Sequence, residues 1–141
     1  MTEPTLDLQK AVRLAFVGSS GVTALVPASA ILDRNLRPEV FPCILIGEGH
    51  AMPSDGLARV RHRAFLDLHV WTNEDGLASC KRIVSAIRDA LKTVGPLDNF
   101  ATADLRITFV RFLREHDEDK AHGAHGHGVV TIEAELVELT T

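Results

Sequence analysis

Apolar and polar side chains alternate along residues 59–72, which is the pattern of a β-strand that buries one face. The mostly apolar row comprises Val60, His62, Ala64, Leu66, Leu68 and Val70. The mostly polar row comprises Arg59, Arg61, Arg63, Phe65, Asp67, His69 and Trp71. The pattern predicts a central strand whose apolar row faces the core and whose polar row mostly faces solvent.

After a turn at residues 73–76, apolar residues recur at steps of three and four, which is typical of a helix with one buried stripe. The stripe comprises Leu77, Cys80, Val84, Ile87 and Leu91. Asn73 suits the N-cap, and Gly95-Pro96 is expected to end the helix. A two-faced strand followed by a one-faced helix indicates a sheet packed under helices.

The N-terminal segments follow the same logic. A first helix is predicted over residues 4–17, where Pro4 fits the first turn. A short helical turn at residues 22–26 and a brief strand at 30–32 precede a strand over 41–48.

The C-terminal third is predicted to be a long hairpin. Leu105, Ile107 and Phe109 alternate with other residues and predict one face of a strand over residues 105–114. The last strand is predicted over residues 129–139. Loops are predicted at residues 49–58, 97–104 and 115–128.

Together these segments predict an α+β fold built as a two-layer sandwich. Two main helices are expected on one face of a mainly antiparallel, four-stranded sheet, in the order αββαββ, with residues 30–32 as an extra short strand if they pair. A length of 141 residues suits a single domain, residues 1–141, with a core of its own.

The composition is ordinary, with 45% hydrophobic and 24% charged residues and a formal net charge of −4. This mild acidity predicts no grip on nucleic acid or on anionic lipid. No signal-peptide pattern and no run long enough to span a membrane is visible, so we expect an intracellularly made protein without a membrane partner. Cys43 and Cys80 lie in apolar settings and are expected to be small buried thiols rather than a disulfide.

Histidines gather late in the chain, at His116, His122, His125 and His127. Imidazole suits zinc or nickel, and the spacing of His122, His125 and His127 could bring two or three ring nitrogens together. The neighbouring glycines make ordering such a loop entropically costly. Two hypotheses stay open, a native metal site and a mobile loop that binds metal adventitiously. The sequence favours the second, and no metal or other cofactor is expected.

The polar row of the central strand has three interpretations. Its arginines could bind phosphate, pair across strands with acids such as Glu133 and Glu135, or contact another subunit. Phe65 and Trp71 on the same row favour cover by another subunit over cover by a loop. The candidate interface residues are Arg59, Arg61, Arg63, Phe65, Trp71, Glu115, Asp117, Glu118 and Asp119.

No pattern of catalytic residues is present. The turn at residues 18–21 lacks the lysine of a phosphate loop, and no G-x-S-x-G elbow occurs. The apolar settings of both cysteines raise the thiol pKa and lower reactivity. The chain is therefore not expected to be an enzyme.

The order of these segments resembles that of the small tail-completion, or tail terminator, proteins of long-tailed phages, prophages and gene transfer agents. The resemblance spans nearly the whole chain and rests on the order and spacing of four segments, residues 21–26, 41–47, 68–72 and 127–130. It implies a non-enzymatic particle component that forms a ring, commonly a hexamer, in the bacterial cytoplasm. It also implies that the ring caps the tail tube and joins the head-tail connector protein.

A ring of this kind lets DNA pass without binding it specifically, which fits a mildly acidic protein. Two other function classes remain as alternatives. A ligand-binding or regulatory α+β dimer predicts a pocket with convergent polar groups. A metal-dependent enzyme using the histidine-rich loop predicts stoichiometric metal.

Overall fold

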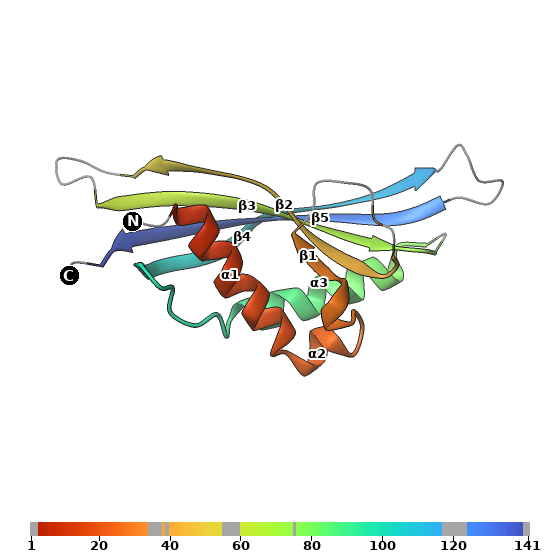
Figure 1. Ribbon diagram of the computed structural model, residues 1–141. Coiled ribbons are helices and arrows are strands. Elements are labelled where there is room, and N and C mark those ends of the chain that lie inside the picture. Colours follow the sequence, from red (N-terminus) through yellow and green to blue (C-terminus); the bar gives the residue numbers. More distant parts are fainter. Residues whose placement is uncertain are drawn as a thin grey trace.

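The computed structural model describes residues 3–33, 38, 40–54, 60–74, 76–116 and 124–139. Within them a five-stranded sheet carries helices on one face (Figure 1). The helices are α1 (Pro4–Val17), α2 (Ser20–Thr23), a 3₁₀ turn (Ala28–Ala30) and α3 (Ala78–Leu91). The strands are β1 (Ile31–Asp33), β2 (Cys43–Pro53), β3 (Arg61–Thr72), β4 (Phe100–His116) and β5 (Ala124–Glu138).

The sheet has the strand order β1-β2-β3-β5-β4. β1 runs parallel to β2, and the other neighbouring strands are antiparallel. The predicted α+β class and helix-covered sheet are confirmed, but four strands and the order αββαββ were too simple. The short segment at residues 31–33 pairs as a fifth strand, and α2 adds a third helix.

The core lies between the sheet and the helices. From the predicted apolar row of β3, Ala64, Leu66, Leu68 and Val70 are fully buried, as the alternation required. α1 presents Leu8, Val12 and Phe16 to them, and α3 presents Cys80, Val84 and Ile87. β5 adds Val130, Ile132, Ala134 and Leu136.

Helix ends follow local chemistry only in part. α1 begins at Pro4 as predicted, and the Glu3 side chain caps it by accepting hydrogen bonds from the Thr5 and Leu6 amides. The prediction of Asn73 as the cap of the second long helix was wrong. α3 begins later, at Ala78, behind Leu77, which provides no side-chain cap.

Three predicted loops were too long because bulges and continued pairing extend the strands. β2 continues past residue 48 to Pro53, with a register shift between Ile46 and Gly49. β4 begins at Phe100 rather than at residue 105, and the hairpin strands β4 and β5 pair as far as His116 and Ala124.

A bulge in the middle of β4 reverses the faces of the strand. Its register shifts between Ile107 and Phe109, so Phe109 does not share the face of Leu105 and Ile107. Phe109 is 58% exposed, while Val110 packs against the core. The prediction that Phe109 shares one face of the strand with Leu105 and Ile107 was therefore wrong.

Candidate functional site

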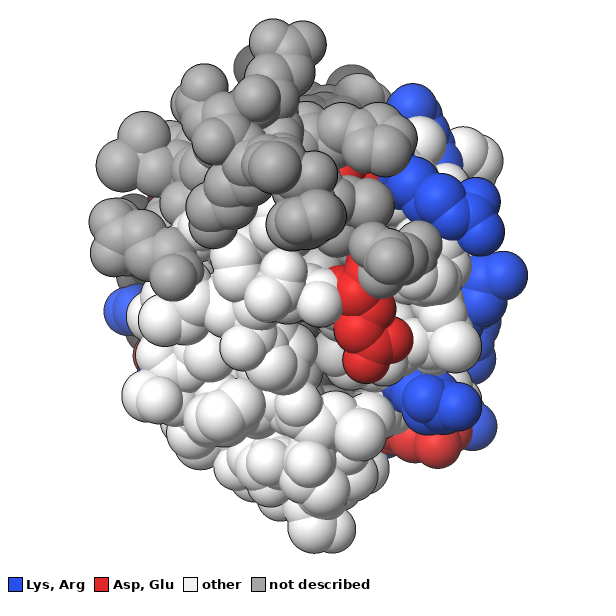
Figure 2. Space-filling model, turned by 90° about the vertical axis from the view of Figure 1, so that its right-hand side faces the viewer, with Lys and Arg blue, Asp and Glu red and all other residues white. Residues whose placement is uncertain are grey.

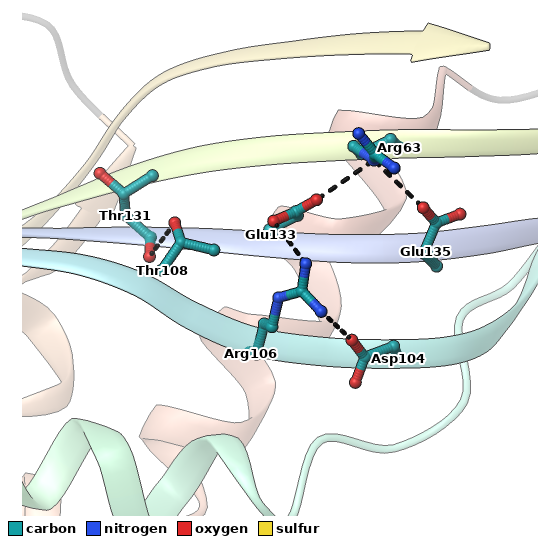
Figure 3. A network of polar contacts seen from close by, with 7 residues as sticks. All are labelled: Arg63, Asp104, Arg106, Thr108, Thr131, Glu133 and Glu135. Carbon is teal, nitrogen blue, oxygen red and sulfur yellow. Dashed lines mark hydrogen bonds and ion pairs between the residues drawn. The ribbon is translucent and has the colours of Figure 1, made fainter. Parts of the chain in front are cut away.

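The face of the sheet opposite the helices, here called the open face, carries most of the residues that the sequence singled out. An ion-pair network crosses three strands of this face (Figure 3). Arg63 Nε lies 3.2 Å from Glu133 Oε1 and 3.1 Å from Glu135 Oε1. Arg106 lies 3.0 Å from both Glu133 Oε2 and Asp104 Oδ2. Cross-strand pairing is thus confirmed for Arg63.

Glu133 sits at the centre of this network and is only 8% exposed, which a carboxylate tolerates when cations meet both of its oxygens. The hydrogen bond and charge of Glu133 raise the pKa of Arg106. Burial opposes ionisation of Glu135, but hydrogen bonds from Ser54 and Arg63 prevail and lower its pKa. The network therefore pairs the charges of its arginines and carboxylates with one another within the open face.

The aromatic residues of the open face stack on histidines. Phe65 stacks on His50 with ring centroids 4.5 Å apart, and Trp71 stacks on His127 at 3.9 Å. Phe41, just before β2, stacks on His125 at 4.6 Å. Trp71 is therefore half-covered by its own chain, although the hypothesis of a subunit contact at Phe65 and Trp71 stays open.

The histidine-rich segment differs from its prediction. His125 and His127 belong to β5 and are only 9% and 7% exposed, so they are not part of a mobile loop. Strand pairing holds them, because His127 has ladder partners in both β3 and β4 and His125 has one in β4. In the described part of the chain, no three His, Cys, Asp or Glu side chains are placed to hold a metal ion.

Several candidate residues lie outside the described residues, namely Arg59, Asp117, Glu118, Asp119 and His122. Of the remaining candidates, Glu115 is brought together with His127, whose Nδ1 lies 2.8 Å from Glu115 Oε1. Arg61 is exposed at the start of β3.

Sequence reasoning missed the contacts of Glu48 and His69. His69 Nε2 lies 3.0 Å from Glu48 Oε2, and His69 Nδ1 lies 2.9 Å from His127 Nε2. Extending the β5 alternation backwards from Val130 would have placed His127 on the same face as Thr131 and Glu133. That signal was available, but the glycines between the histidines suggested a loop instead.

In the view of Figure 2 the described side chains are mostly uncharged, and cations gather along one edge. The exposed cations of α3 and β4 are Lys81, Arg82, Arg88, Lys92, Arg106, Arg111 and Arg114. A pocket of about 300 Å³ lies beside Leu25, Phe41 and Ile83, with Glu74 and Arg82 as its charged lining residues.

The described residues offer no activated nucleophile among their cysteines. Cys43 and Cys80 are free and buried, as predicted. Burial raises the pKa of Cys43 to about 11 and also raises that of Cys80, which keeps both thiols protonated. Among the described residues, no helix has the length and apolar run needed to cross a bilayer.

Comparisons with known proteins place this arrangement in context. The family model "Tail completion protein gp17" matches residues 10–134. A chain from the "Virion of native gene transfer agent (GTA) particle" superposes with a TM-score of 0.68 at 21% identity, covering 92% of this chain and 94% of that one. The chain in "Structure of bacteriophage SPP1 gp17 protein" gives 0.55 at 20% identity, covering 98% and 92%. None of the curated proteins matches.

Proposed function

Because the chain belongs to the tail completion protein gp17 family, we propose that its copies form a ring, a hexamer, that caps the finished tail tube and joins it to the head connector. The family match over residues 10–134 is the observation that carries this proposal. The described residues support it, because their polar and aromatic side chains form ion pairs and stacked rings across a sheet rather than a reactive group in a cleft.

A closed ring of identical subunits requires two different patches on each subunit that fit one another. The open face supplies one candidate patch, formed by Arg59, Arg61, Arg63, Phe65 and Trp71. The second candidate patch is the acidic segment formed by Glu115, Asp117, Glu118 and Asp119. Opposite charge on the two patches would favour head-to-tail contact between copies over contact of like patches.

Charge reversal tests this pairing directly. Arg61→Glu should dissociate the ring, and the double variant Arg61→Glu/Glu118→Arg should restore it, as read by native mass spectrometry and light scattering. Lys10→Glu, on the exposed side of α1, is the matched control and should leave the ring intact. Each variant must keep the far-ultraviolet circular dichroism of the wild type.

Some ring proteins assemble only on their tube, so the same variants should also be mixed with purified tail tubes. The proposal predicts added density at one end of each tube by electron microscopy with the wild type. It predicts loss of this density with Arg61→Glu. A wild-type chain that stays monomeric in solution and does not decorate tubes would contradict the ring.

The proposal also includes passage of DNA through the ring without specific binding. The net charge of −4 disfavours retention of a polyanion. Since Glu133 and Glu135 are paired with arginines, repulsion of phosphate must come from other acids than these two. Gel-shift assays at physiological salt should show no complex with duplex DNA.

The pocket beside α3 gives the ligand-binding alternative one specific observation. Its lining by Leu25, Phe41 and Ile83 with Glu74 and Arg82 suits a small, partly apolar molecule. A thermal-shift screen with metabolites tests this alternative, because a bound ligand raises the melting temperature.

A further inference from the structure

Four side chains on the open face form a continuous row across four adjacent strands, here called the histidine bridge. It consists of Glu48 on β2, His69 on β3, His127 on β5 and Glu115 on β4. The three contacts are Glu48 Oε2 to His69 Nε2 at 3.0 Å, His69 Nδ1 to His127 Nε2 at 2.9 Å, and His127 Nδ1 to Glu115 Oε1 at 2.8 Å. All four ring nitrogens are thus engaged within the row.

The surroundings hold both rings in place. His127 is 7% exposed and stacks on Trp71 with centroids 3.9 Å apart. Gly47 lies so close to His69 that a Cβ there would be 2.6 Å from Cδ2 of the ring. His127 is therefore confined by Trp71, and the backbone at Gly47 lies directly against His69.

The three contacts fix the number of ring protons. Each carboxylate contact requires a proton on the histidine nitrogen, and the contact between the two rings requires one further proton, because two acceptors or two donors would repel. Three protons on four nitrogens make one ring an imidazolium and leave the other neutral. Two neutral rings carry only two protons and lose one contact, while two imidazolium rings lose the contact between them.

We infer that the histidine bridge is a pH-sensitive set of hydrogen bonds that holds the β4–β5 hairpin against β2 and β3 and weakens in acid. His69 is the charged ring, donating to Glu48 and to His127, and His127 is the neutral ring, donating to Glu115. This inference does not depend on the proposed ring, because it concerns the stability of the β4–β5 hairpin within one subunit.

Other groups bear on the bridge from each element packed against it. Arg111 on β4 adds positive charge near His127, and His125 lies two residues along β5. Asp67, two residues along β3, is engaged by Thr131 Oγ1 at 2.7 Å. Burial lowers the pKa of His127, and the charges of His69 and Arg111 lower it further, against the opposing effect of Glu115. The hydrogen bond from His69 lowers the pKa of Glu48.

Both shifts have the same consequence for folding. His127 with a lowered pKa takes up its proton more readily when unfolded, so acid favours the unfolded hairpin as the pH falls below the ordinary histidine value. Glu48 with a lowered pKa contributes stability above its ordinary value, and this contribution is lost as the pH falls through the shifted one. The bridge is therefore firmest where the two rings share three protons, and it weakens when acid adds a fourth.

Histidine-selective NMR tests the proton count. Correlation spectra of the ¹⁵N-labelled protein at pH 7 should show both nitrogens of His69 protonated and only Nδ1 of His127 protonated. Glu48→Gln changes an exposed side chain and removes the carboxylate that accepts from His69, so the doubly protonated form of His69 should be less populated at pH 7 than in the wild type. A neutral His69 in the wild type at pH 7 would overturn the inference.

Hydrogen exchange tests whether the β4–β5 hairpin opens more readily in acid. After correction for intrinsic rates, amides of residues 125–130 should exchange at least about tenfold faster at pH 5 than at pH 7. His127→Gln, which removes the buried ring whose pKa is lowered, should abolish most of this pH dependence, whereas His50→Gln, which removes a stacked histidine of the same face outside the bridge, should retain it. Equal pH dependence in His127→Gln and the wild type would overturn the inference, and the NMR result decides if His127→Gln does not fold.

Discussion

Gly126 provides the sharpest test of how the hairpin packs. It pairs with Thr72 across the β3–β5 ladder, and a Cβ built at this position would lie 2.4 Å from Thr72 Oγ1 and 3.2 Å from Cys80 Sγ. The first distance is far inside van der Waals contact, so Gly126→Ala must displace either the Thr72 side chain or a strand.

The size of the effect follows from overpacking. Inserting a methyl group into a well-packed interior typically costs about 1–3 kcal/mol. Thr72 is 2% exposed and its hydroxyl lies 3.5 Å from Cys80 Sγ, so rotating the side chain away also disturbs α3. For a chain of this size the expected loss corresponds to a melting temperature lower by about 3–10 °C.

Two further variants make the measurement specific. Gly95→Ala is the matched control, because no atom lies within 4 Å of a Cβ built there, and its unfolding free energy should stay within about 0.5 kcal/mol of the wild type. Thr72→Ala/Gly126→Ala removes the clashing hydroxyl and should recover part of the loss, giving a clear non-additive term in urea unfolding.

The competing interpretation puts Gly126 in a loose, glycine-rich tip. In that case Gly126→Ala would be neutral or slightly stabilising, since alanine restricts the unfolded chain more than glycine does. A melting temperature equal to that of Gly95→Ala would therefore refute the packing described here.

Other changes test separate parts of the molecule. Ile132→Ala, at a fully buried position, should lower the unfolding free energy by about 2–5 kcal/mol, whereas exposed Phe109→Ala should cost much less if the bulge in β4 is correct. Native Cys43 should react with iodoacetamide at pH 8 at least about 100-fold more slowly than after unfolding, because its pKa of about 11 is two units above the ordinary 9.0. Asp7→Ala removes the acceptor of two 3.0 Å bonds from Asn99 and should cost about 1–3 kcal/mol by urea titration.

Alternation and helical spacing were enough to predict most of the core. The apolar row of β3 and the α3 stripe were placed correctly because apolar residues that recur on one face of a strand or helix are stable only when that face packs against the core. The first helix was predicted with its observed bounds because Pro4 and the following glycine mark both ends locally.

The failures arise where long-range pairing overrides local signals. Glycines near His125 and His127 suggested a loop, but Gly126 is needed inside a strand, where Thr72 and Cys80 leave no room for a side chain. The bulge that exposes Phe109 depends on the register against β5, which no local pattern reports.

The sequence predicted which residues share the open face, but it did not predict most of the contacts between them. The sequence put Arg63, Phe65 and Trp71 on one face, but it offered cross-strand pairing only as one of three interpretations of the arginines, and the structure shows this pairing for Arg63. The histidine bridge needed four strands in register before Glu48 and Glu115 could be placed at its two ends.

The most direct test of the proposed ring is electron microscopy of particles made without this chain. The account predicts tails of uncontrolled length that fail to join heads, with rescue by the wild-type gene and not by Arg61→Glu. Tails of normal length, joined to heads in the absence of the chain, would contradict it.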